Sequence, residues 1–260
     1  MPSGNSDNEI IVHPPECPTP RRQVISVGDG EFAQGKHFDV AVSGNGVQNS
    51  ETPPLRRAES KVLWFGAAIA GDKADASCSH NGVALAGCSS TANTGDGGVA
   101  RSFNDGFSLG YVNSVAFTHN RGWALTFDKG VSIARSGFAE TFRQGVATTN
   151  SDDGDGIASA GPGGIALAMV NRNIVCVGPG GVLAGFWQDQ DGMPRTAFCP
   201  VGCDGIHKPD TFYRFVDGQF IPLTDAETKA AKHKINECTA PWKKSPQYAE
   251  FEARVRKERG

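Results

Sequence analysis

The residue types best suited to chemistry gather in one segment near the end of the chain. Cys199, Cys203 and His207 follow one another with three residues between each pair, and Asp204 lies among them. Thiolate and imidazole are zinc ligands, but the sequence has neither a tight C-x2-C knuckle nor a local fourth ligand. A cysteine beside His207 would instead be a nucleophile with its base. We favour cysteines packed in a structural cap, so we assign no metal and no cofactor.

A second group of candidate catalytic residues is an acidic turn that contains Asp152, Asp153 and Asp155. Neighbouring carboxylates can hydrolyse glycosidic bonds or bind calcium. The spacing does not match an EF-hand loop, so a solvated surface turn is the simpler interpretation. The sequence also contains no phosphate loop, dinucleotide-binding fingerprint or G-x-S-x-G elbow.

An internal repeat must position these residues, because it fills the middle of the chain. A small residue followed by a short apolar run recurs at intervals of 16, 16, 16, 16, 15, 19 and 17 residues. The starts are Gly66, Gly82, Gly98, Ser114, Gly130, Gly145, Gly164 and Gly181. Each unit has room for two short strands and two turns rich in Gly, Asn, Asp and Ser. The pattern predicts a mainly β fold, a narrow parallel β-solenoid of about 16 residues per coil.

The direction of the strand side chains decides which residues are available for binding. The position after each start is mostly valine and the next is mostly alanine, and small residues suit a narrow interior. The expected outward columns then include Val99, Val115, Val131, Phe107, Trp123 and Phe138, which are candidate interaction residues. The opposite arrangement, with the large residues inside, is the alternative. Outward apolar ladders need a cover, either a partner chain, the N-terminal arm or the C-terminal tail.

Three repeat segments resemble those of a known class of proteins. GVALAG (82–87), GGIALA (163–168) and GGVLAG (180–185) are similar to short Gly-Val/Thr-Ala-x-Ala-Gly repeats in bacterial and phage proteins. The resemblance covers roughly residues 60–223 and extends to a terminal cap that resembles residues 204–220. It implies a β-solenoid, and it supplies no established catalytic residues.

Composition shifts along the chain predict four parts. These are a Pro-rich extended arm (1–60), the β-solenoid (61–185), a β-hairpin cap (186–223) and a helical tail (224–260). Two apolar stretches in the arm, 24–27 and 38–42, would add a strand or an imperfect first coil. In the tail, Thr224 and Glu227 form a capping box that predicts a helix over 225–238. A second helix is expected to begin after Ser245 and to run to about Arg259.

The overall composition excludes several classes of protein. Eight leucines among 260 residues are too few for a helical bundle, and no apolar run is long enough for a membrane span. The net charge of −3 argues against nucleic-acid binding. Seven scattered cysteines and a polar N-terminus predict a cytoplasmic protein, or one that is exported without a Sec signal peptide.

We therefore expect a non-enzymatic, rigid structural or interaction module in a bacterial or phage assembly, with a protein partner or as a homo-oligomer. The first alternative is an effector delivered without a signal peptide, whose active region would be the segment with Cys203 and His207. The second is a hydrolase that uses the Asp152–Asp155 turn, with Asp153 as its candidate catalytic residue.

Overall fold

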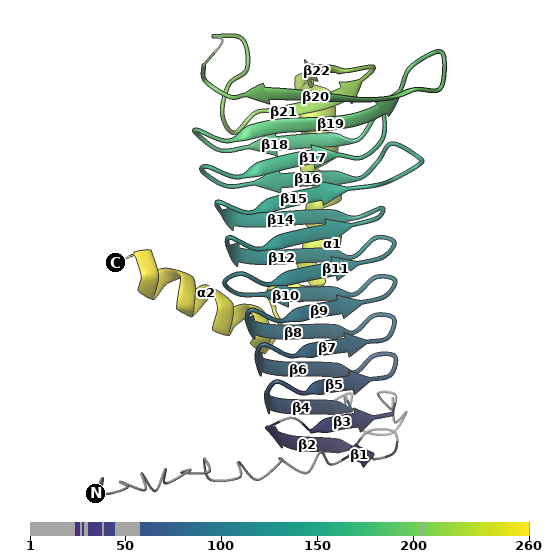
Figure 1. Ribbon diagram of the computed structural model, residues 1–260, viewed down its shortest axis with the longest axis vertical. Coiled ribbons are helices and arrows are strands. Elements are labelled where there is room, and N and C mark those ends of the chain that lie inside the picture. Colours follow the sequence, from purple (N-terminus) through teal and green to yellow (C-terminus); the bar gives the residue numbers. More distant parts are fainter. Residues whose placement is uncertain are drawn as a thin grey trace, which may run out of the picture.

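The chain folds into a rod of coils stacked along one axis (Figure 1). The computed structural model describes residues 24–26, 28, 31–37, 39–44, 58–203 and 205–259. Successive strands alternate between two sheets of 11 strands each. The solenoid has about nine turns of about 16 residues. The expected mainly β fold, with a hairpin cap and a helical tail, is therefore confirmed.

The odd-numbered strands up to β19, together with β20, form one sheet, which we call the odd sheet. It consists of β1 (Val24–Ser26), β3 (Val40–Ser43), β5 (Ala67–Ala70), β7 (Val83–Ala86), β9 (Val99–Ser102), β11 (Val115–Thr118), β13 (Val131–Ala134), β15 (Val146–Thr149), β17 (Ile165–Ala168), β19 (Val182–Gln188) and β20 (Pro194–Pro200). Its neighbours up to β19 are parallel and pair one coil apart, so Val99 lies between Val83 and Val115.

The even-numbered strands up to β18, together with β21 and β22, form the opposite sheet, which we call the even sheet. It consists of β2 (Phe32–His37), β4 (Glu59–Trp64), β6 (Asp75–His80), β8 (Thr91–Asp96), β10 (Phe107–Gly110), β12 (Trp123–Asp128), β14 (Phe138–Arg143), β16 (Ile157–Ala160), β18 (Ile174–Val177), β21 (Phe212–Val216) and β22 (Gln219–Pro222). Here Trp123 pairs with Phe107 on one side and Phe138 on the other.

Small side chains fill the space between the two sheets, as the repeat predicts. The inward column of the odd sheet is fully buried and consists of Ala68, Ala84, Ala100, Ala116, Ser132, Ala147, Ala166 and Leu183. The facing column of the even sheet is also buried and includes Ala76, Ala92, Ser108, Ala124, Ala139 and Ala158. The alternative with the large residues inside is therefore wrong, because a narrow coil has room only for small side chains.

Hydroxyl groups inside the rod connect the two sheets. Ser102 of β9 lies 2.9 Å from Ser108 of β10, and Thr126 of β12 lies 3.0 Å from Ser132 of β13, measured between hydroxyl oxygens. Ser108 and Ser132 are also donors to backbone carbonyl oxygens. Buried polar groups destabilise a fold when they lack partners, so these bonds stabilise the four hydroxyl groups in the core.

The corner before each odd strand requires a left-handed backbone. The residues with positive φ at this corner are Phe65, Asn81, Gly97, Asn113, Lys129, Gln144, Gly163 and Gly180. Glycine adopts this conformation freely and asparagine tolerates it better than other residues. Three of these eight residues are glycine, so the glycine-rich composition follows partly from this recurring left-handed corner.

The solenoid begins earlier than the expected boundary at residue 61. Strands β1, β2 and β3 and the start of β4 lie before that position, and they pair in the same parallel order as the later coils. The two apolar stretches of the expected arm therefore contribute to coils where the structure describes them. The rest of the 1–60 arm, including residues 1–23 and 45–57, lies outside the described residues.

Antiparallel strands close the far end of the rod. Strand β20 folds back on β19, and β21 and β22 form a hairpin whose turn is Asp217–Gly218. The ring of Phe215 is fully buried against Gly185, where any larger side chain would overlap it. This aromatic plug covers the last coil, so its hydrophobic interior is not exposed to solvent.

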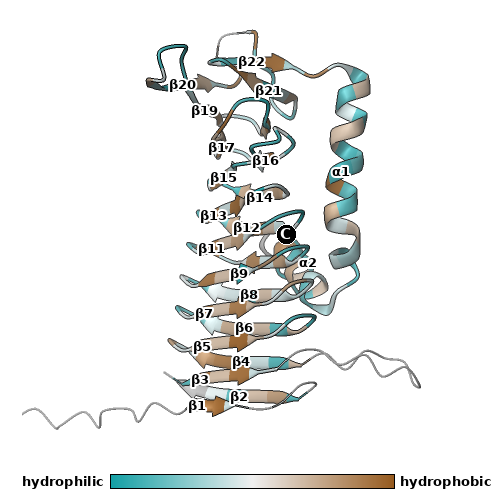
Figure 2. Ribbon diagram, turned by 90° about the vertical axis from the view of Figure 1, so that its right-hand side faces the viewer, coloured by the Kyte–Doolittle hydropathy of each residue, from teal (hydrophilic) through white to brown (hydrophobic). Residues whose placement is uncertain are grey.

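Two helices follow the cap. Helix α1 (Asp225–Lys243) starts with the expected capping box, because Thr224 and Glu227 each accept a hydrogen bond from the other's backbone N–H. It runs five residues beyond the expected end at residue 238 and includes Pro241. Helix α2 (Pro246–Arg259) starts where a second helix is expected. Figure 2 shows α1 running alongside the rod, and Figure 1 shows α2 running crosswise to the rod axis.

Candidate functional site

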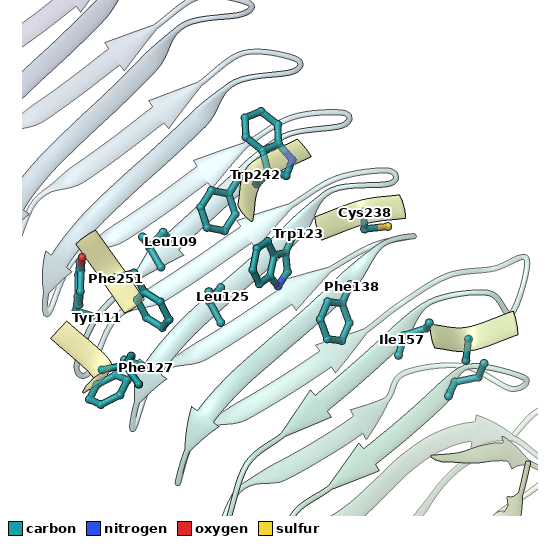
Figure 3. Packing of buried hydrophobic residues seen from close by; sticks show 14 residues of the cluster. Leu109, Tyr111, Trp123, Leu125, Phe127, Phe138, Ile157, Cys238, Trp242 and Phe251 are labelled. Carbon is teal, nitrogen blue, oxygen red and sulfur yellow. The ribbon is translucent and has the colours of Figure 1, made fainter. Parts of the chain in front are cut away.

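The aromatic ladder of the even sheet packs against the chain's own helices. The rings of Phe107 and Trp123 are stacked with their centroids 4.8 Å apart, and Trp242 of α1 lies 6.0 Å from Phe107. Tyr248 of α2 lies 5.4 Å from Trp123. Figure 3 shows the rings of Trp123 and Trp242 in this contact between the sheet and the helices. The interaction residues Phe107, Trp123 and Phe138 are at most 4% exposed, so in this arrangement they bind the tail rather than another chain.

The outward face of the odd sheet is different, because no described element covers it (Figure 2). Its two outward columns from β7 to β17 consist of Val83, Leu85, Val99, Arg101, Val115, Phe117, Val131, Ile133, Val146, Thr148, Ile165 and Leu167. Val99 is the most exposed of the three predicted interaction valines, at 39%, and Val115 and Val131 are half-buried. We call these columns the valine face. It extends along most of the rod.

One charged residue, Arg101, interrupts the valine face. Its guanidinium carbon lies 5.0 Å from the ring centre of Phe103 and 5.2 Å from that of Phe117. A guanidinium that stacks on aromatic rings keeps its charge while covering apolar surface. His119 stacks on Phe103 at 5.2 Å, and burial, followed by the charges of nearby arginines, lowers its pKa.

The cap brings together two of the three residues that the sequence proposes for thiol or zinc chemistry. The sulfur of Cys199, on β20, lies 2.9 Å from Nδ1 of His207. Cys203 is exposed, and Asp204 lies outside the described residues. Within the described chain, no three His, Cys, Asp or Glu side chains are grouped closely enough to hold a metal ion.

The carboxylates of the acidic turn contact different neighbours. Asp155 forms an ion pair with Lys234 of α1 and accepts a hydrogen bond from Ser151. These bonds hold its pKa below the usual value, although burial acts in the opposite direction. Asp152 lies 3.9 Å from Arg135, and Asp153 is exposed. Asp155 therefore helps to attach α1 to the rod, and the turn does not combine its carboxylates into one site.

A polar cleft that the sequence does not predict lies beside the aromatic ladder. Its volume is about 390 Å³, and it lies between the early even strands and α2. The floor includes Glu59, Asp75 and Thr91, and the wall includes Gln247 and Arg254. The sequence does contain an indication of this cleft. Asp75 and Thr91 occupy the two positions before Phe107 in the same outward column of the even sheet. The column changes there from polar to aromatic.

Electrostatic contacts tie α2 to this cleft. Arg254 donates to Asp96 at 3.1 Å and lies over the ring of Tyr111 at 4.3 Å. Gln247 donates to Asp75 at 3.4 Å. Burial and the charge of Glu250 raise the pKa of Tyr111 to about 12. Some polar groups of the cleft therefore serve to hold α2 against the even sheet.

The comparisons with other proteins add no family assignment: no protein-family model, curated protein or solved structure matches the chain. The resemblance to bacterial and phage repeat proteins stays a prediction. Neither α1 nor α2, the two helices of the described residues, is long and apolar enough to cross a membrane.

Proposed function

We propose that this chain is a rigid, non-catalytic β-solenoid that pairs with a second copy of itself through the valine face. The observation that carries the proposal is the difference between the two sheets. The chain covers the aromatic ladder of the even sheet with its own helices, whereas the valine face has no cover among the described residues. An apolar stripe of this length on a soluble protein favours burial against another surface.

A second copy matches the valine face in the spacing of its side-chain rows and in its low charge. A two-fold interface places the same patch against itself, so side-chain rows at one coil spacing can interdigitate with identical rows. Arg101 is the single charge in the columns from β7 to β17, so self-pairing brings few like charges together. The six strands β7 to β17, four residues wide, cover on the order of 400 Å² at ~4.8 Å per strand. That area is about half of the roughly 800 Å² per partner of standard interfaces, so we expect a weak dimer that forms at micromolar concentration.

The test is the mass of the full chain in solution as a function of concentration. Analytical ultracentrifugation should show a dimer of the 27.4 kDa chain at micromolar concentration. The double variant Val99→Lys/Val131→Lys should raise the dissociation constant at least 100-fold, because it places four lysines in the interface. A monomer at every concentration up to about 100 μM would refute the proposal.

A matched variant separates this face from a general effect of added charge. Ala249→Lys/Ala253→Lys adds the same two charges on the exposed surface of α2 and should leave the dimer unchanged. Equal dissociation of both variants would argue against an interface at the valine face. Unchanged thermal unfolding of both variants would show that the rod itself is intact.

A further inference from the structure

The proposed function makes no use of the pair formed by Cys199 and His207. Cys199 lies on β20, where it pairs with Leu183 of β19 and packs at the edge of the aromatic cap. Its sulfur is 2.9 Å from Nδ1 of His207, well within hydrogen-bonding distance for sulfur. This contact joins a nucleophile to a base, which are the two groups required for thiol attack on a carbon electrophile.

The cap holds His207 in place through its backbone and its ring. Its carbonyl oxygen accepts a hydrogen bond from the N–H of Gly202 at 2.9 Å. The next residue, Lys208, donates its N–H to the hydroxyl of Tyr213 at 2.7 Å. The imidazole packs between Tyr213, at 5.3 Å, and the edge of Phe220, at 6.2 Å. A base that is fixed before reaction loses less entropy in the transition state.

The other described cysteines differ from Cys199 in burial or in their neighbours. Burial raises the pKa of Cys78, Cys176 and Cys238, which keeps these thiols protonated and unreactive. Cys88 is partly exposed and Cys203 is the most exposed of the described cysteines, and neither sulfur forms a hydrogen bond with a described histidine. Cys203 is therefore an internal control, since it lacks a base although it is more exposed than Cys199.

We propose that Cys199 and His207 form a nucleophilic thiol site that takes soft carbon electrophiles, namely alkylating agents and activated acyl groups. In the reaction with iodoacetamide, the sulfur of Cys199 forms a bond to the methylene carbon. The carbon–iodine bond breaks, and iodide leaves with the electron pair. Nδ1 of His207 takes the thiol proton and releases it to solvent. This inference is independent of pairing through the valine face.

The experiment measures the alkylation rate of each cysteine in the folded, full-length protein by peptide mass spectrometry. With iodoacetamide at pH 7, Cys199 should react at least tenfold faster than Cys203, although it is less exposed. His207→Gln should slow Cys199 about tenfold and leave the rate of Cys203 unchanged, because glutamine accepts a hydrogen bond but does not act as a base.

Two outcomes would overturn the proposal. One is a rate for Cys199 that equals or falls below that of Cys203 in the unmodified protein. The other is a rate for Cys199 that stays constant or rises in His207→Gln, since burial alone would then control the thiol. Tyr213→Phe provides a second variant that loosens His207 without removing it, and it should slow Cys199 less than His207→Gln does. Unchanged thermal unfolding of both variants would show that the cap stays folded.

Discussion

Glu140 is an acidic side chain within the apolar surface between the even sheet and the helices. It follows Leu125 in register on the outward face, next to Trp123. Burial raises its pKa to about 7, although the indole of Trp123 and the charge of Lys243 lower it. The folded protein therefore keeps Glu140 protonated at a pH where the unfolded chain ionises it.

This raised pKa predicts how stability depends on pH. The stabilising contribution is complete below the usual carboxyl value of 4.5 and is lost as the pH rises to about 7. Glu140→Gln, which stays neutral, should match the original protein at pH 4.5 and exceed it by about 2–3 kcal/mol at pH 8. Urea unfolding at both pH values measures the difference. The exposed Glu237→Gln should show no such change, and an equal response of the two variants would exclude Glu140 as the cause.

The sequence was informative about individual residues wherever one column repeats. Alternation along each strand predicts the buried alanines and the outward valines, because side chains on a strand point to opposite faces. The spacing of Cys199 and His207 indicated a pair, but the choice of cysteine required the antiparallel fold of β20. The sequence places Asp75 and Thr91 in the same column as the aromatic residues. Only the position of α2 makes that part of the column the floor of a cleft.

At the scale of the element, α1 shows how tertiary packing overrides local sequence. The expected helix ended at residue 238, and Pro241, three residues beyond that end, lacks the N–H that a helix interior uses. The observed helix continues to Lys243, because Cys238, Thr239 and Trp242 are buried against the rod. Trp242 reaches Phe107 from the last turn. The burial of this large ring outweighs the local disadvantage of proline.

The corners provide an element-scale prediction that concerns backbone conformation alone. Lys129 has φ of 53° at the corner where other coils have Gly97, Gly163 and Gly180. Lys129→Gly should raise the free energy of unfolding by about 0.5–1 kcal/mol, because glycine removes the strain of a left-handed conformation. Lys129→Ala removes the same side chain but keeps the strain, so it should give no gain. Chemical denaturation of both variants distinguishes strain from the loss of the lysine charge.

At the scale of the whole molecule, the rod is asymmetric across its two sheets. The repeat alone predicts two apolar faces, and the sequence left three candidates for their cover. The structure assigns the C-terminal tail to the even sheet, where Tyr248, Phe251 and Val255 are spaced for one helix face. The sequence does not choose the target of these residues, because both sheets offer apolar columns. Only the aromatic column provides rings that match those of the helices.

Phe251 is the residue through which this assignment can be tested. It is fully buried, and its ring centre lies 5.8 Å from Tyr111, 6.1 Å from Phe127 and 5.5 Å from Phe142. Phe251→Asp should release α2 while the coils stay folded, because burying an unpaired carboxylate costs more than the helix gains from its remaining contacts. Limited trypsin digestion should then cleave after Arg254 and Lys244 many times faster than in the original protein.

The exposed Ala253→Asp, on the opposite side of α2, should keep the original cleavage rate. The circular dichroism of the β-sheets should persist in Phe251→Asp, and the release of α2 should increase binding of a hydrophobic dye to the uncovered rings. Global unfolding of Phe251→Asp would mean instead that the helices are part of one cooperative unit with the coils. Slow cleavage in both variants would show that Phe251 does not hold α2, and the even sheet would then need another explanation for its covered face.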